Sequence, residues 1–338
     1  MTSNLPIGMA LIGCGNIGTL GHAPAYASAV GVSLRAVCDL DPSRAENVST
    51  ITGAVTRSLE EILADPAIEA VDVAVPTEEH ERVSSQALSA GKHVLVEKPI
   101  TTSLEAAHRL VDQAAQKNLT LIVGHVRRFD PRYLAIAAEL AAGSVGTPRY
   151  MRRAERQWLP FSGDAWSWSG PGGGVLMDVG VHVADLVRWL LGEPTTVFAT
   201  TRHIRPEARE WGDHVFVTFG LGESVTAVGE ASWAHPRSFA TFYGSLEIVG
   251  TDGILNLRDA EGPLLIIGPD GVEHPRFGPL LSTIPAAFSA QLEHFASVIA
   301  GDIEPFQTAS DAARSLRACL AAAESVDTGS PVSLTGSV

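Results

Sequence analysis

The sequence predicts an α/β protein with two domains. Residues 1–125 form a domain around a parallel sheet, and residues 126–338 form an α/β domain with a large, mainly antiparallel open sheet. Three observations support this. A glycine-rich turn, GCGNIG, stands between a predicted strand and a predicted helix. Strands and helices then alternate to residue 124, which is typical of parallel sheets. From residue 149, longer β-rich runs follow with few helices between them.

The first strand, residues 6–12, leads directly into the glycine-rich turn. Gly13, Gly15 and Gly18 allow a tight turn and let backbone amides approach a pyrophosphate at the N-terminus of a helix that runs to residue 29. A second strand, residues 32–38, ends in Asp39, where a carboxylate accepts hydrogen bonds from an adenosine ribose. This combination predicts a Rossmann domain that binds a dinucleotide.

The same acid favours one dinucleotide over the other. A carboxylate at Asp39 repels a 2'-phosphate, so NAD is the expected cofactor. Arg44, on the helix that begins with Asp41 and Pro42, could turn toward such a phosphate, so NADP stays the alternative.

The rest of the first domain continues the alternation. The expected elements are a helix with the capping box Ser58 and Glu61, a strand at 70–75 ended by Pro76, a helix capped by Thr77 and closed by Gly91, a helix capped by Thr102 and Glu105, and a strand at 120–124.

Lys98 ends a short apolar strand in the run GKHVLVEKP, in a chain with 21 arginines and three lysines. An ammonium, unlike a guanidinium, can be tuned toward neutrality by burial and neighbours. Thr77 and Lys98 lie at the carboxyl ends of neighbouring predicted strands, where open α/β sheets bind ligands. Lys98 is therefore a candidate catalytic residue.

Composition narrows the class of protein. A formal net charge of −14 disfavours nucleic acid and anionic membranes as partners. Cys14, Cys38 and Cys319 are odd in number and not at metal-ligand spacing, so we expect buried thiols. Because no run of 18 apolar residues occurs, we expect a soluble, cytoplasmic protein.

The second domain carries a helix with polar residues on one face. The β-rich runs are residues 196–203, 214–219, 225–232, 243–249 and 264–267. In GGGVLMDVGVHVADLVRWLLG, residues 172–192, Asp178 and His182 are four apart on a predicted helix, and Asp185 follows as a mainly structural residue. Asp178 and His182, with His125 and His214, lack a zinc-binding spacing, so no metal site is predicted.

GCGNIG with Asp39, then VEKP, GHVRRFDP at 124–131 and GGGVLMDVGVHVADL together resemble the Gfo/Idh/MocA oxidoreductases, the glucose-fructose oxidoreductase and inositol dehydrogenase family. The resemblance covers nearly the whole chain. It implies a Rossmann domain joined to a C-terminal domain whose open sheet builds homodimers or homotetramers. It also implies a cis peptide before Pro99 and catalytic roles for Lys98, Asp178 and His182.

Two positions depart from the family pattern. Relatives usually have proline-asparagine where this chain has Pro76 and Thr77, and Val126 stands where asparagine or glutamine is frequent. The candidate cofactor contacts are Gly13, Gly15, Asn16, Ile17, Gly18, Asp39, Pro76, Thr77, His80, Glu97, Lys98 and Arg128. The candidate substrate contacts are His125, Arg156, Trp166, Asp178 and His182.

The expected reaction is hydride transfer at a hydroxyl-bearing carbon, with His182 as general base, Lys98 stabilising the reacting oxygen and Asp178 orienting substrate or imidazole. Trp158, Trp166 and Trp168 suit the faces of a sugar or cyclitol, although core packing explains any one of them as well. Two alternatives remain: an NAD-dependent glycosidase acting through transient oxidation, and a non-catalytic dinucleotide-binding sensor.

Overall fold

The computed structural model describes residues 6–157, 174–204, 212–235, 243–258, 264–268, 271–273 and 280–335. Contacts divide the chain into two compact units. Unit 1 comprises Met1–Phe129 and Ile284–Ala313, and unit 2 comprises Asp130–Thr283 and Arg314–Val338.

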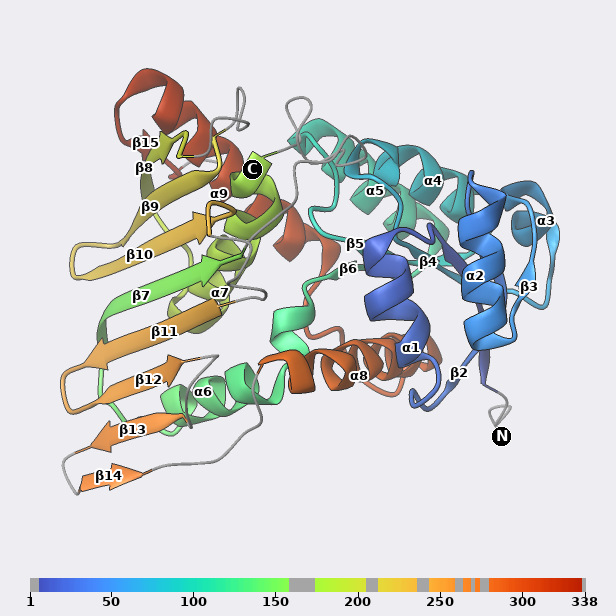
Figure 1. Ribbon diagram of the computed structural model, residues 1–338. Coiled ribbons are helices and arrows are strands. Elements are labelled where there is room, and N and C mark those ends of the chain that lie inside the picture. Colours follow the sequence, from blue (N-terminus) through green and yellow to red (C-terminus); the bar gives the residue numbers. More distant parts are fainter. Residues whose placement is uncertain are drawn as a thin grey trace. The chain divides into compact units, whose positions relative to one another are not determined.

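Unit 1 is built on a six-stranded parallel sheet (Figure 1). Its strands are β1 (Ile7–Ile12), β2 (Val32–Cys38), β3 (Val55–Thr56), β4 (Ala70–Val73), β5 (His93–Glu97) and β6 (Leu121–Gly124). They lie in the order β3-β2-β1-β4-β5-β6, and every pair is parallel. This confirms the predicted Rossmann sheet. The order reverses between β1 and β4, so a ligand site is expected outside the carboxyl ends of these strands.

The helices of unit 1 begin close to the expected residues, but two caps differ from the prediction. They are α1 (Ala23–Ala25), α2 (Pro42–Thr52), α3 (Leu59–Ala64), α4 (Thr77–Ser89) and α5 (Leu104–Lys117). The capping box of Ser58 and Glu61 is confirmed. The N-cap of α4 is Pro76 rather than Thr77, and that of α5 is Ser103, whose side chain accepts a hydrogen bond from the amide of Ala106.

The helical segment after the glycine-rich turn is shorter than predicted and contains a π-helical turn. The π-turn η1 (Gly18–His22) leads into α1, which ends at Ala25 rather than at residue 29. Its wider spacing changes which side chains face the sheet. His22 is one of the residues that this turn buries.

A helix from the C-terminal half of the sequence completes the core of unit 1. The apolar side chains Phe288, Leu292 and Phe295 of α8 (Leu280–Ala300) pack in one cluster with residues of the sheet, including Met9 and Leu95. The expected second domain, residues 126–338, contained this helix. By contacts, Ile284–Ala313 lie in the same compact unit as Met1–Phe129.

Unit 2 is built on a nine-stranded sheet (Figure 1). Its strands are β7 (Pro148–Arg156), β8 (Thr196–Arg202), β9 (His214–Leu221), β10 (Val225–Ser232), β11 (Tyr243–Gly250), β12 (Ile254–Arg258), β13 (Leu265–Gly268), β14 (Gly271–Glu273) and β15 (Val332–Ser333). The order is β14-β13-β12-β11-β7-β10-β9-β8-β15. Among the described strands of this second sheet, only β7 and β10 pair in parallel, which confirms a mainly antiparallel sheet.

Helices of unit 2 pack against one face of this sheet. They include α6 (Pro131–Ala141), the π-turn η4 (Leu176–Gly180), α7 (Val181–Leu191) and α9 (Ala309–Thr328), whose last fifteen residues belong to this unit. α7 contacts β7 and β10, and η4 contacts β10. A Cβ on Gly229 of β10 would lie 2.4 Å from Cγ1 of Val183, so this glycine lets helix and sheet approach closely.

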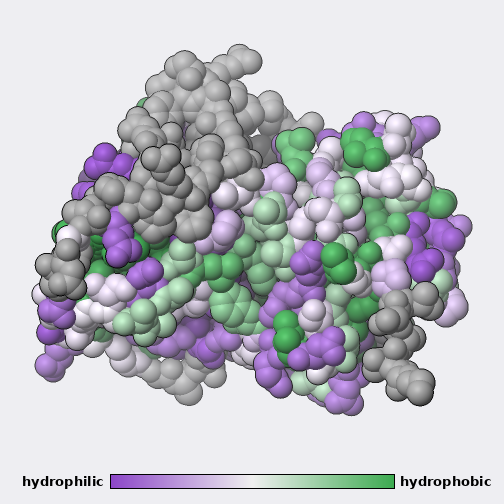
Figure 2. All heavy atoms as spheres, turned by 90° about the horizontal axis from the view of Figure 1, so that it is seen from below, coloured by the Kyte–Doolittle hydropathy of each residue, from purple (hydrophilic) through white to green (hydrophobic). Residues whose placement is uncertain are grey.

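The surface mixes hydrophilic and hydrophobic side chains. On the face shown in Figure 2, hydrophobic side chains lie in small groups between hydrophilic ones. Among the described residues, no helix combines the length and apolar character needed to cross a bilayer. Cys14 and Cys319 are buried and Cys38 is half-buried, and all three thiols are free.

Candidate functional site

Of the three glycines in the glycine-rich turn, only Gly15 has room for a side chain. Gly13 has φ +100°, and a Cβ on Gly18 would lie 2.1 Å from the carbonyl oxygen of Gly13. These two glycines are required by the turn itself. A Cβ on Gly15 would meet no atom within 4 Å. A glycine there is explained by a ligand that approaches the backbone, as the pyrophosphate of a dinucleotide does.

Asp39 lies at the carboxyl end of β2, beside this turn. Its Oδ2 accepts a hydrogen bond from the amide of Cys14 at 2.7 Å, and its Oδ1 accepts one from the amide of Asp41 at 2.8 Å. These bonds fix the plane of the carboxylate next to the glycine-rich turn. The position fits the acid that binds the adenosine ribose.

Two buried side chains of α4 lie at the ends of β4 and β5. Thr77 is 1% exposed, and its buried hydroxyl has no hydrogen-bond partner in the described part of the chain. His80 lies with Nδ1 2.8 Å from the carbonyl oxygen of Pro99 and Nε2 3.0 Å from that of Val75. Burial lowers the pKa of His80. Both ring nitrogens face protein carbonyls, so His80 ties together the loops that follow the two strands.

Lys98 follows β5 directly, and its peptide bond with Pro99 is cis, as the resemblance implied. The side chain is half-buried. Its amide donates a hydrogen bond to Oε2 of Glu97 at 3.1 Å, and Oε1 of Glu97 lies 3.0 Å from Nε2 of His22. The loop that carries Lys98 is therefore held from one side by His80 and from the other by Glu97.

The other predicted residues of unit 1 differ in exposure. Asn16, Ile17 and Pro76 are exposed near the glycine-rich turn and the end of β4. His125 and Arg128 are buried, directly after β6 and in the short 3-10 helix Val126–Phe129. Asn16 and Ile17 lie within the glycine-rich turn, and Pro76, His125 and Arg128 follow the carboxyl ends of strands, as the sequence predicted.

Asp178 and His182 belong to unit 2. Asp178 lies in η4, and His182 is the second residue of α7 and is 8% exposed. Oδ2 of Asp178 accepts hydrogen bonds from Nε1 of Trp233 at 3.1 Å and from Nε2 of Gln157 at 3.4 Å. Sequence reasoning missed both donors. Trp233 directly follows β10 and Gln157 directly follows β7. A polar side chain directly after a strand was the signal that could have identified them.

Asp185 connects two helices of unit 2. Its Oδ1 accepts a hydrogen bond from the hydroxyl of Ser315 at 3.0 Å, and Ser315 in turn accepts one from Nη1 of Arg188 at 2.6 Å. This contact joins α7 to α9, in agreement with the structural role expected for Asp185.

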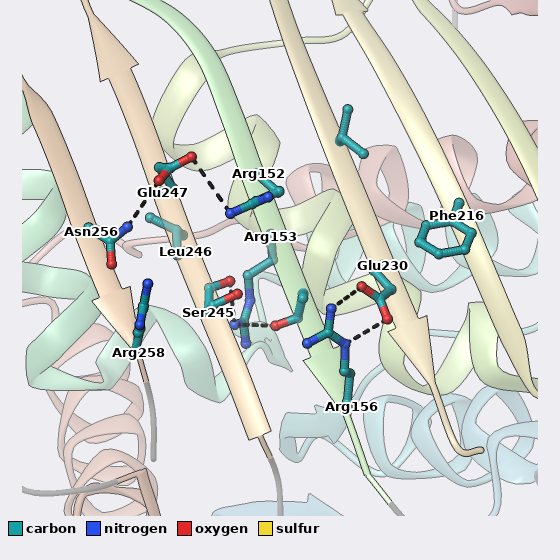
Figure 3. A pocket seen from close by; sticks show the side chains of 12 residues that line it. Arg152, Arg153, Arg156, Phe216, Glu230, Ser245, Leu246, Glu247, Asn256 and Arg258 are labelled. Carbon is teal, nitrogen blue, oxygen red and sulfur yellow. Dashed lines mark hydrogen bonds and ion pairs between the residues drawn. The ribbon is translucent and has the colours of Figure 1, made fainter. Parts of the chain in front are cut away.

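Arg156, the last residue of β7, lies on the face of the nine-stranded sheet opposite to the face that packs against α7 (Figure 3). It forms two hydrogen bonds to the carboxylate of Glu230, one of them from Nε at 2.6 Å. It lines a hollow of about 470 Å³ together with Arg152, Phe216, Glu230, Glu247 and Arg258. Side chains alternate along a strand, so Gln157 rather than Arg156 points toward Asp178.

The three tryptophans that the sequence analysis considered for sugar binding, Trp158, Trp166 and Trp168, lie outside the described residues.

The residues around the glycine-rich turn fit a dinucleotide. Gly15 leaves room at the N-terminus of a helical segment, the Asp39 carboxylate is fixed beside it, and the hydroxyl of Thr77 is buried where strand order reverses. Among the described residues, no group of three or more His, Cys, Asp or Glu is arranged to hold a metal ion.

Comparison with known proteins identifies both halves of the chain. Residues 7–125 match the model of the oxidoreductase family with an NAD-binding Rossmann fold, and residues 133–256 match the GFO/IDH/MocA C-terminal domain. The NAD(+)-dependent scyllo-inositol 2-dehydrogenase of Bacillus subtilis is 30% identical over 96% of this chain and 95% of its own length. The 1,5-anhydro-D-fructose reductase of Ensifer adhaerens is 29% identical over 82% of this chain and 83% of its own.

A solved structure shows the same fold. The scyllo-inositol dehydrogenase of Lactobacillus casei, crystallised with NAD(H) and scyllo-inositol, superposes with a TM-score of 0.82 at 24% identity. The match covers 98% of this chain and 100% of that one.

Proposed function

The chain belongs to the Gfo/Idh/MocA family of NAD-dependent oxidoreductases, and from this premise we propose that it oxidises a hydroxyl-bearing carbon of a cyclitol, sugar or sugar derivative. The observation that carries the proposal is Lys98, held at the carboxyl end of β5 by contacts to Glu97 and by the contact of His80 to Pro99. The names of two relatives, a scyllo-inositol dehydrogenase and an anhydrofructose reductase, support the substrate class.

The residue types support a mechanism for this reaction. Bound NAD supplies the hydride acceptor. An alcohol carbon loses hydride only as its hydroxyl proton leaves, so a base must reach that oxygen, and we assign this role to His182. The Lys98 ammonium donates to the same oxygen and stabilises its developing negative charge. Asp178, oriented by Trp233 and Gln157, positions the substrate hydroxyl or the imidazole.

The decisive experiment measures the absorbance of reduced nicotinamide with NAD and a panel of inositols, sugars and anhydrosugars, beside Lys98→Ala. A rise that depends on Lys98 supports the proposal and identifies the substrate. If NAD binds but no panel member is oxidised, the proposal is contradicted. Cleavage of glycosides without net NAD reduction would identify the glycosidase alternative instead.

Gly15→Ala and Gly18→Ala are expected to separate cofactor binding from folding. A Cβ at Gly15 meets no protein atom, so thermal stability should stay unchanged while affinity for NAD falls roughly tenfold or more. A Cβ at Gly18 collides with the backbone of Gly13, so this variant should also lose about 1–3 kcal/mol of stability. Calorimetric titration with NAD and thermal melts measure both. Wild-type affinity in Gly15→Ala would argue against pyrophosphate binding at this turn.

The face of the nine-stranded sheet that carries Phe198 and Phe216 is proposed as the surface for a homodimer or homotetramer. Phe198 and Phe216 are 37% and 46% exposed there, while alternate residues of β9 are buried on the face that packs against helices. We expect Phe216→Asp to lower the mass measured by light scattering, because charge is unfavourable at the centre of an interface. Ile303→Asp in unit 1, at the same 46% exposure, is the control and should leave the mass unchanged. A monomeric wild type would contradict the proposal.

A further inference from the structure

A buried histidine links the π-turn that begins at Gly18 to the strand that ends directly before Lys98. His22, in η1, is 1% exposed. Its Nδ1 lies 2.8 Å from Oδ2 of Asp72 on β4, and its Nε2 lies 3.0 Å from Oε1 of Glu97 on β5. Asp72 and Glu97 are 0% and 5% exposed. The ring of Phe288 from α8 packs on the imidazole, with centroids 4.8 Å apart.

The geometry identifies the protonation state of this imidazole. A carboxylate can only accept hydrogen bonds, so two carboxylates at the two ring nitrogens require a proton on each nitrogen. Burial alone lowers the pKa of His22, but Asp72 and Glu97 outweigh it and raise the pKa to about 10. Geometry and charge thus both favour an imidazolium at His22, between the carboxyl groups of Asp72 and Glu97.

A protonated His22 would stabilise the carboxylates of Asp72 and Glu97. Asp72 accepts a second hydrogen bond from the hydroxyl of Tyr26 at 3.0 Å, and its buried Oδ1 has no partner within the described residues. Burial raises the pKa of Glu97, but the hydrogen bond from His22 and the charges of His22 and Lys98 bring it below its ordinary value. Without His22, two buried carboxylates would face each other with no cation between them, and one would take up a proton.

Glu97 transmits this charge to the catalytic loop. One of its oxygens is bound to His22, and the other accepts the amide hydrogen of Lys98. The sequence thus brings η1, β4, β5 and the Lys98 loop into one chain of hydrogen bonds: Tyr26, Asp72, His22, Glu97, Lys98.

We propose that His22 is a positioning residue for the reaction: as an imidazolium between Asp72 and Glu97, it keeps Glu97 ionised against the backbone of Lys98 and thereby sets the position and charge of that ammonium. The inference rests on the proposed function only through the role of Lys98. The cofactor turn and the catalytic lysine are then parts of one electrostatic unit, because His22 lies on the π-turn that begins at Gly18.

The first test uses the wild-type protein and no substrate. NMR of isotope-labelled ring nitrogens should show both nitrogens of His22 protonated at about pH 8, where an ordinary histidine is neutral. A neutral His22 at that pH would overturn the inference. This measurement needs no variant, so it stands even if substitutions at this buried position impair folding.

The second test follows Lys98 directly. The chain has three lysines, so Cε-labelled lysine gives three signals, which Lys→Arg variants assign. Gln at position 22 is neutral, so one of the two carboxylates should take up a proton in His22→Gln, and the titration midpoint of Lys98 should shift from its wild-type value. Turnover should fall about tenfold or more, with the Kd for NAD changed less than about threefold.

His93→Gln is the matched control. His93 lies at the amino end of the same strand, β5, and its Nδ1 accepts a hydrogen bond from the amide of Thr120 at 2.9 Å. This variant also removes a half-buried imidazole, but it should leave the titration of Lys98 and turnover as in the wild type. An unchanged Lys98 titration in folded His22→Gln would overturn the inference, even with full Lys98-dependent activity. A shifted titration in a protein that oxidises no polyol would instead contradict the proposed function alone.

Discussion

His182→Ala should lower kcat roughly 100- to 10,000-fold while NAD still binds. General base catalysis contributes about this factor, and His182 is the base assigned to the substrate hydroxyl. His182 lies near the start of α7 and is 8% exposed, so removing its ring also leaves a small cavity, and stability must be measured in parallel. Steady-state kinetics with the substrate found in the panel give the size of the loss.

The pH dependence distinguishes a lost base from a damaged fold. In the wild type, kcat/KM should fall on the acid side as the base becomes protonated, and this limb should vanish in His182→Ala. His294→Ala is the control, because His294 packs between Phe129 and Phe306 in unit 1 and has no role in the mechanism. Wild-type turnover in a folded His182→Ala protein would remove His182 from the reaction.

Lys98→Ala is expected to lower kcat by about 100- to 1,000-fold. This is the usual effect of removing a hydrogen-bond donor that stabilises a developing oxyanion. Lys98→Arg should not restore activity, because a planar guanidinium neither changes protonation readily nor fits a point contact. Lys98 is half-buried at the carboxyl end of β5, so both variants should fold.

Lys92→Ala provides a control on the same strand. Lys92 precedes β5 and donates a hydrogen bond from Nζ to the carbonyl oxygen of Asp65 at 2.7 Å, at the opposite end of β5 from Lys98. Its loss should affect stability but not kcat. Substantial turnover in Lys98→Ala, or full rescue by Lys98→Arg, would show that the ammonium is not part of the chemistry.

The sequence was informative wherever chemistry demands particular residues at a fixed spacing. The glycine-rich turn and Asp39 belong to one such pattern, and β1, β2 and the parallel order of the sheet agree with it. The cap positions of α4 and α5 differ from the prediction by one residue. Thr102 and Ser103 are adjacent hydroxyl residues that can both cap a helix, and the helix begins after Ser103, the stronger N-cap of the two.

Contacts between residues far apart in the sequence could not be predicted from such local patterns. His22 meets Asp72 and Glu97 from 50 and 75 residues away, and Asp178 meets Trp233 from 55 residues away. No local periodicity records such pairings. Strand β7 was also missed, because its charged residues hide the apolar alternation. Arg153 and Glu155 are buried there as an ion pair, with Nη2 2.8 Å from the carboxylate.

Helix α8 has a consequence for how the protein is made. Residues 1–129 leave the ribosome long before Phe288, Leu292 and Phe295, yet these three side chains belong to the same apolar cluster as Met9 and Leu95. During synthesis, the nascent first domain therefore exposes the surface that α8 later covers, and it stays incomplete until α8 has been translated as well.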